Sequence, residues 1–101
     1  MFMMKKRYIR KQALEELDKT NKRYFKILDA FNDRTIDNIK TMSSEVMLLE
    51  VDMIRLSYLW VKDKLSYVKY DDSEIEFINT RNEELERMRL YLRDEIDKEE
   101  S

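Results

Sequence analysis

Residues 39–68 carry two interleaved series of apolar side chains, and no other stretch constrains the fold as strongly. The first series is Ile39, Met42, Val46, Leu49, Met53, Leu56 and Trp60, and the second is Met47, Val51, Ile54, Tyr58, Val61, Leu65 and Val68. In each series the spacing alternates between three and four residues, which places its members along one face of an α-helix. One neighbour cannot cover two faces, so we expect this central helix to lie between two others, from its own chain or from another.

The chain of 101 residues contains no Gly and no Pro. A β-sandwich or an α/β fold of this length would ordinarily need several of these residues for its tight turns. Charged residues make up 42% of the chain, as expected for long helices with solvated outer faces. We therefore predict an all-α fold, an elongated three-helix up-down-up bundle or helical hairpin with coiled-coil-like packing that self-associates.

Three helices are expected in one domain that covers residues 1–101, at about residues 5–31, 36–69 and 74–98. Asn32 is the predicted end of the first helix, because Asn tolerates the left-handed conformation that Gly would otherwise supply. Thr35 is then the predicted N-cap of the second helix. Asp71 and Ser73 each have a Glu three residues later, which is the spacing of a helix N-cap, and they mark the start of the third helix.

The segment 41–44 leaves an alternative open within the second helix. Its hydroxyl groups could cap a new helix start, with Glu45 in the first turn. We favour one continuous helix, because Ile39 and Met42 stay in phase with the apolar residues that follow. At about 1.5 Å per residue, that helix would be roughly 50 Å long, which suits an elongated bundle.

Each outer helix has one apolar face. That of the first helix holds Ile9, Ala13, Leu14, Leu17, Tyr24, Ile27, Leu28 and Phe31, and that of the third holds Ile78, Leu85, Met88 and Leu92, with Ile75 and Ile96 at its edges. Because the third stripe is thin, we expect that helix at the rim of the bundle. Asn21 falls in the pattern of the first helix, where it either fixes the register from a buried position or sits at a rim.

Charge is distributed unevenly along the chain. Residues 1–31 hold nine basic and four acidic residues, whereas residues 71–101 hold five basic and twelve acidic ones. The first and third helices are therefore electrostatically complementary. We expect the first helix to face the third helix of its own chain or of a partner.

The composition removes most catalytic and metal-binding chemistry. The chain has no Cys and no His, so it lacks thiolates and the commonest metal ligand. A phosphate-binding loop needs Gly, and no Ser has a His that could activate it. The carboxylates at Glu83, Glu84 and Glu86 lack the His three residues later that a di-metal site needs, and a solvated acidic face is their simpler interpretation. We predict a non-enzymatic protein without metal or cofactor.

Basic residues gather in two clusters of the first helix, where aromatic residues are interleaved with them. The clusters contain Lys5, Lys6, Arg7, Arg10, Lys11, Lys22, Arg23 and Lys26. Such residues can neutralise phosphates while aromatic rings stack on bases, so this helix is a candidate nucleic-acid contact. Two observations favour pairing with the acidic third helix instead: Tyr24 falls on the apolar face, and the net charge of the chain is −2.

The segment 58–61 is apolar on every side of the central helix, and Leu48 and Leu59 point away from both series. An oligomer or partner interface is therefore expected at Leu48, Val51, Tyr58, Leu59, Trp60 and Leu65. Aromatic anchors of this kind often dominate the energetics of interfaces. We also expect Trp60 to be buried in the core, so that its replacement by Ala would lower the free energy of unfolding by roughly 3–5 kcal/mol.

These features favour a small accessory or inhibitor protein that occupies the surface of a protein partner and forms a homodimer or higher oligomer. A nucleic-acid-associated protein and a scaffold for assembly are the alternatives. Frequent Lys, Ile, Asn, Tyr and Phe suggest an AT-rich gene of a phage or mobile element. Without an apolar run of about 20 residues no membrane span is expected, and the cytoplasm, of the host if the gene is phage-encoded, is the default location.

Overall fold

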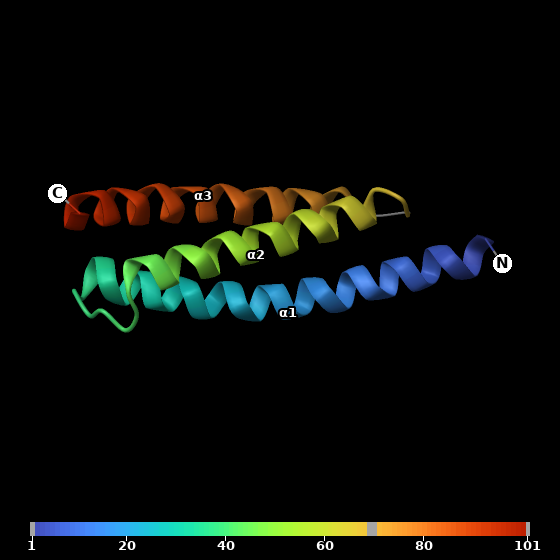
Figure 1. Ribbon diagram of the computed structural model, residues 1–101. Coiled ribbons are helices and arrows are strands. Elements are labelled where there is room, and N and C mark those ends of the chain that lie inside the picture. The colour runs from blue at the N-terminus through green and yellow to red at the C-terminus, as the bar shows by residue number, and fades with distance from the viewer. Residues whose placement is uncertain (1, 69–70, 101) are drawn as a thin grey trace.

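The chain forms three α-helices that run up, down and up in an elongated bundle (Figure 1). In this computed structural model, α1 spans Phe2–Ile36, α2 spans Ser44–Leu65 and α3 spans Asp72–Glu100. The structure describes residues 2–68 and 71–100, with side chains from residue 5 onward, and these ranges contain no β-strand. The bundle measures 57 × 22 × 20 Å along its principal axes. The predicted all-α, three-helix architecture is confirmed.

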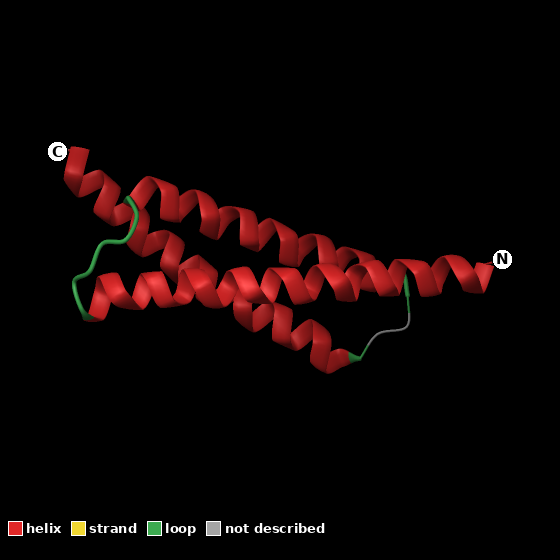
Figure 2. Cartoon of the chain, turned by 90° about the horizontal axis from the view of Figure 1, so that it is seen from below, coloured by secondary structure: helices red, strands yellow, loops and turns green. Residues whose placement is uncertain are grey.

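α2 lies in the middle and packs along both α1 and α3. Its second apolar series forms the centre of the core, since Met47, Val51, Ile54, Tyr58, Val61 and Leu65 are 0% exposed. Figure 2, turned by 90°, shows that the three helices cross obliquely rather than lying exactly side by side. α1 and α3 are thus the outer helices, as the thinner apolar stripe of α3 predicts.

The apolar faces of the outer helices meet this core as expected. The buried residues of α3 are the four that its spacing predicts, Ile78, Leu85, Met88 and Leu92. On α1, Ala13, Tyr24 and Ile27 are buried, and Ile9, Leu17, Leu28 and Phe31 are partly buried against the core. Leu14 is the exception, because it lies exposed at the edge of the predicted face.

α1 continues past Asn32 to Ile36, so the predicted turn at residues 32–35 is wrong. The left-handed residue is Asn38, with φ of 56°, six residues beyond the predicted position. Around it the amide of Ile39 donates to the carbonyl of Asp33 at 2.9 Å, which closes the end of the helix. Thr35 does not cap α2, because its hydroxyl donates to the Phe31 carbonyl at 3.0 Å within α1.

α2 begins at Ser44, so the favoured continuous helix from residue 36 is wrong and the alternative start is confirmed. Ser43 is the N-cap: its hydroxyl oxygen accepts from the Val46 amide at 3.2 Å, and Glu45 stands in the first turn. Capping of an orphan N–H outweighs the in-phase positions of Ile39 and Met42. α2 is therefore 22 residues, about 33 Å, long.

The turn between α2 and α3 also ends in a helix N-cap. The Asp71 carboxylate accepts from the Ser73 amide at 3.0 Å, and this hydrogen bond lowers the pKa of Asp71. Of the two predicted caps, Asp71 is thus confirmed, while Ser73 lies inside the first turn of α3. α2 ends at Leu65, four residues before its predicted end at Lys69, which itself lies outside the described residues.

Side chains join α1 to α3 as the charge distribution predicts. Arg10 pairs with Glu74 at 3.0 Å and Arg34 pairs with Glu95 at 2.6 Å. Between these pairs, the guanidinium of Arg81 lies over the rings of three aromatic residues, at 4.4 Å from Tyr24, 5.0 Å from Phe25 and 4.7 Å from Phe77. The basic helix therefore faces the acidic helix of its own chain.

Two substitutions on neighbouring turns of α2 test the placement of the core. Ile54→Ala should cost roughly 2–5 kcal/mol of unfolding free energy, because it removes a fully buried side chain. Leu56→Ala should change it by no more than about 0.5 kcal/mol, because Leu56 is mostly exposed. Urea unfolding followed by circular dichroism at sub-micromolar protein measures both. Equal losses would mean that the core is placed wrongly.

Candidate functional site

The first apolar series on α2 lies on the surface, on the side of the helix opposite to the core. The exposed fractions are 56% for Val46, 62% for Leu49, 46% for Met53, 65% for Leu56 and 41% for Trp60. We call these five residues, with the exposed neighbour Leu59, the outer face of α2. We expected a helix over each apolar side of α2. In this chain, α1 and α3 both pack against the second series, so a helix over the first series would have to come from another chain.

The physical reason is the number of apolar faces. α1 and α3 each offer one, and both faces turn towards the same side of α2 to close a single core. The rest of the first series continues the exposed surface into the loop before α2, where Ile39 is exposed and Met42 is partly buried. The chain thus presents an apolar row that its own helices leave uncovered.

A shallow groove runs beside the outer face, between α1 and α2. It has a volume of about 310 Å³, and its lining includes Met42, Val46, Leu49 and Met53. Arg23, Lys26 and Glu50 form its polar rim, where Arg23 pairs with Glu50 at 2.8 Å. The groove extends the apolar surface towards α1 and gives it a rim with two cationic side chains.

The structure divides the predicted interface residues into two groups. Val51, Tyr58 and Leu65 lie fully buried in the core of the chain, so in this fold they cannot contact a partner. The Tyr58 hydroxyl instead donates to the amide oxygen of Asn21 at 2.6 Å, and burial raises its pKa. Leu48 is half-buried, whereas Leu59 and Trp60 are exposed.

The expectation that Trp60 belongs to the core is wrong. Its ring lies on the outer face, and the ammonium of Lys64 stands 5.7 Å from the ring centroid. The spacing of Val46, Leu49, Met53 and Leu56 predicts this row, and within the chain the row is exposed. The sequence pattern correctly predicts a second apolar side on α2, but no helix of the described chain covers it.

The predicted nucleic-acid residues lie in two groups along α1. Lys5, Lys6, Arg7 and Lys11 are exposed near the start of α1, and Lys22 lies roughly 16 Å beyond Lys11 along the helix, at about 1.5 Å per residue. Arg10 and Arg23 pair with carboxylates of α3 and α2, and Lys22 pairs with Asp18 at 3.2 Å. Lys26 is exposed and lines the groove beside the outer face.

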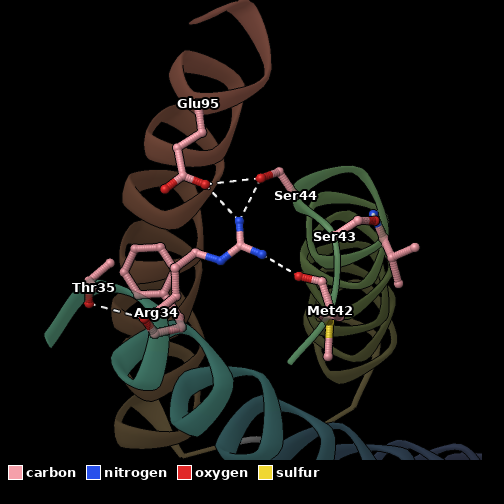
Figure 3. A network of polar contacts seen from close by, with 8 residues as sticks. Arg34, Thr35, Met42, Ser43, Ser44 and Glu95 are labelled. Atoms are coloured by element: carbon pink, nitrogen blue, oxygen red, sulfur yellow. Dashed lines mark hydrogen bonds and ion pairs between the residues drawn. The ribbon is translucent and has the colours of Figure 1, made fainter. Parts of the chain in front are cut away.

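A buried polar cluster at one end of the bundle was missed from the sequence (Figure 3). Nη1 of Arg34 donates to the Ser44 hydroxyl at 2.5 Å and to the Glu95 carboxylate at 2.6 Å, and Nη2 donates to the Met42 carbonyl. Ser44 in turn donates to Glu95 at 2.9 Å. Arg34 follows Tyr24, Ile27 and Phe31 at three-four spacing, and that phase was the available signal.

This cluster joins all three helices through directed polar contacts. Arg34 and Ser44 are 4% and 3% exposed, and both line a cavity of about 320 Å³ beside the cluster. Burial of the Glu95 carboxyl raises its pKa, but hydrogen bonds from Arg34, Ser44 and Tyr91 outweigh that effect and lower the pKa below its ordinary value. The charged form of Glu95 is therefore the one that stabilises the folded chain.

Within residues 2–68 and 71–100, no three Asp or Glu side chains are grouped so that they could hold a metal ion. None of the helices in these ranges combines the length and the apolar character that crossing a bilayer requires. Comparison with models of protein families, with curated proteins and with solved structures finds no match for this chain.

Glu95→Gln tests the electrostatic part of this cluster through pH. Because the folded-state pKa of Glu95 is lowered, its contribution is present at neutral pH and is lost as the pH falls below about 4. The variant should be less stable than the wild type by about 2 kcal/mol at pH 7, as for a hydrogen bond to a charged group, and the difference should shrink at pH 3.

Glu76→Gln is the matched control for this measurement, because Glu76 is an exposed residue of the same helix. Its melting temperature should follow that of the wild type at both pH values. A Glu95→Gln deficit that is equally large at pH 3 and pH 7 would contradict the lowered pKa.

Proposed function

We propose that this chain is a non-enzymatic protein-binding module that uses the outer face of α2 to occupy an apolar surface of a partner. One observation carries the proposal: five large apolar side chains follow one another along a single helix face, each 41% to 65% exposed. Single exposed apolar residues are ordinary on protein surfaces. A contiguous row of them marks an interaction site.

The shape of this surface suits recognition of a helix or of an apolar groove. Side chains at three-four spacing are the anchors by which an amphipathic helix binds a groove. Trp60 supplies an aromatic anchor at one end of the row, and such residues commonly dominate binding energy. The opposite side of α2 is fixed in the core, so the outer face is already ordered before a partner binds.

The same reasoning supports an accessory or inhibitory role. Neither the composition nor the polar cluster at Arg34 offers a catalytic constellation, so the chain would influence a partner by covering its surface. The case for nucleic-acid binding by the basic residues of α1 is weaker than the case for protein binding, since Arg10 and Arg23 already form ion pairs with carboxylates of the same chain.

The double variant Leu49→Lys/Leu56→Lys tests the proposal. Both side chains are more than half exposed, so the melting temperature should stay within a few degrees of the wild type. Binding of the partner, either a protein captured from the native host or another copy of this chain, should be lost, because two charges would have to be desolvated against an apolar surface. Affinity capture with quantitative mass spectrometry, together with calorimetry, measures both effects.

Leu90→Lys provides the control, because Leu90 is similarly exposed but lies on α3. It should retain the captured proteins. Retention of the same proteins by the double variant would refute the proposal. Capture of RNA or DNA that weakens steeply with salt, and disappears when Lys5, Lys6, Arg7 and Lys11 become Ala, would support the nucleic-acid alternative instead.

A further inference from the structure

We infer that the partner of the outer face is a second copy of this chain, in a two-fold dimer whose two α2 helices run parallel. This inference rests on the proposed function, because it names the occupant of the same surface. Three features of the described residues support it: the size of the apolar surface, its periodicity, and the charges of the helices that flank it.

The size of the outer face matches what a dimer needs. Six side chains that are each about half exposed amount to roughly 500 Å² of apolar area, at the upper end of patches on ordinary monomers. The groove beside the face adds the side chains of Met42, Arg23 and Lys26. Two such faces together would bury roughly 1,000 Å², which is the lower bound for a specific interface, and the grooves beside them add to that area.

The spacing of the apolar side chains on the outer face suits pairing with the same helix of a second copy. From residue 46 to residue 60 the spacing is three, four, three and four, which is the a and d pattern of a coiled-coil seam. Leu49 and Leu56 hold the d positions, and Val46 holds the first a position. Within parallel coiled coils, Leu at d with a β-branched residue at a favours two strands. Met53 and Trp60 hold the other two a positions. The same helix from a second copy offers the same spacing of knobs and holes.

The charges of the flanking helices distinguish the two possible two-fold arrangements. α1 carries ten basic and five acidic residues, whereas α3 carries five basic and eleven acidic ones. A two-fold axis along α2 lays α1 of one copy opposite α3 of the other, on both sides of the seam. An axis across α2 would place α1 opposite α1 and α3 opposite α3. Opposite charges therefore favour the parallel arrangement.

Single cysteines test this geometry directly, because the native chain has none. In the parallel dimer, residues of the same number face each other, so Leu49→Cys alone and Leu56→Cys alone should each form disulfide-linked dimers under mild oxidation. The Leu90→Cys control on α3 should stay unlinked. Non-reducing electrophoresis reads the result. Links that form only when the two α2 variants are mixed would show antiparallel helices and overturn the inference.

The mass in solution separates this inference from the proposed function. Light scattering at tens of micromolar should give twice the chain mass of 12.5 kDa for the wild type and the single mass for Leu49→Lys/Leu56→Lys. A monomeric wild type whose cysteine variants stay unlinked would overturn the dimer. If the double variant of that monomer still lost its captured host proteins, the proposed function would stand with a different partner.

Discussion

The burial of the second apolar series of α2 between α1 and α3 is the interaction on which the rest of the structure depends. Each outer helix has one apolar face, and both faces are used on the same side of α2. The core is complete once they meet, and no further apolar helix face of the described chain is left for the other side. The exposed row on α2 is therefore a consequence of how three helices share one core.

Polar contacts fix how the helices are aligned along that core. Burial of apolar surface is non-directional and would tolerate several alignments. The guanidinium of Arg34 makes directed hydrogen bonds to Ser44 and Glu95, and that of Arg81 lies within 4.4 Å of the centre of the Tyr24 ring. These two contacts join different parts of α1 to α3. They add the specificity that the apolar packing lacks.

The all-α class, the number of helices, the buried stripe of α3 and the pairing of basic α1 with acidic α3 were predictable from periodicity and charge. The helix boundaries were less so, because Asn38 and Ser43 compete with other residues that have the same local chemistry. The outer face was found as a pattern but misplaced, as Trp60 illustrates. Both series on α2 are equally periodic, and only the faces of distant helices decide which one is buried.

The burial of Arg34 was beyond sequence reasoning for a related reason. Its position is in phase with the core residues of α1, but a charged side chain is rarely buried unless other side chains form hydrogen bonds or ion pairs with it. Those partners, Ser44 and Glu95, lie 10 and 61 residues away along the chain. The side of α2 that faces outward and the burial of Arg34 are both long-range properties.

The first turns of α1 project beyond the facing ends of α2 and α3 in both views of the bundle (Figures 1 and 2). No acidic residue lies in the first turn of α1, and Lys5, Lys6 and Arg7 follow it directly. Positive charge at the positive end of a helix dipole is unfavourable, and the side chains of residues 5–8 are exposed, so packing adds little to the intrinsic helix propensity of this segment. Its amide hydrogens should exchange with solvent faster than those of the rest of α1, and a trypsin-like protease should cleave here first.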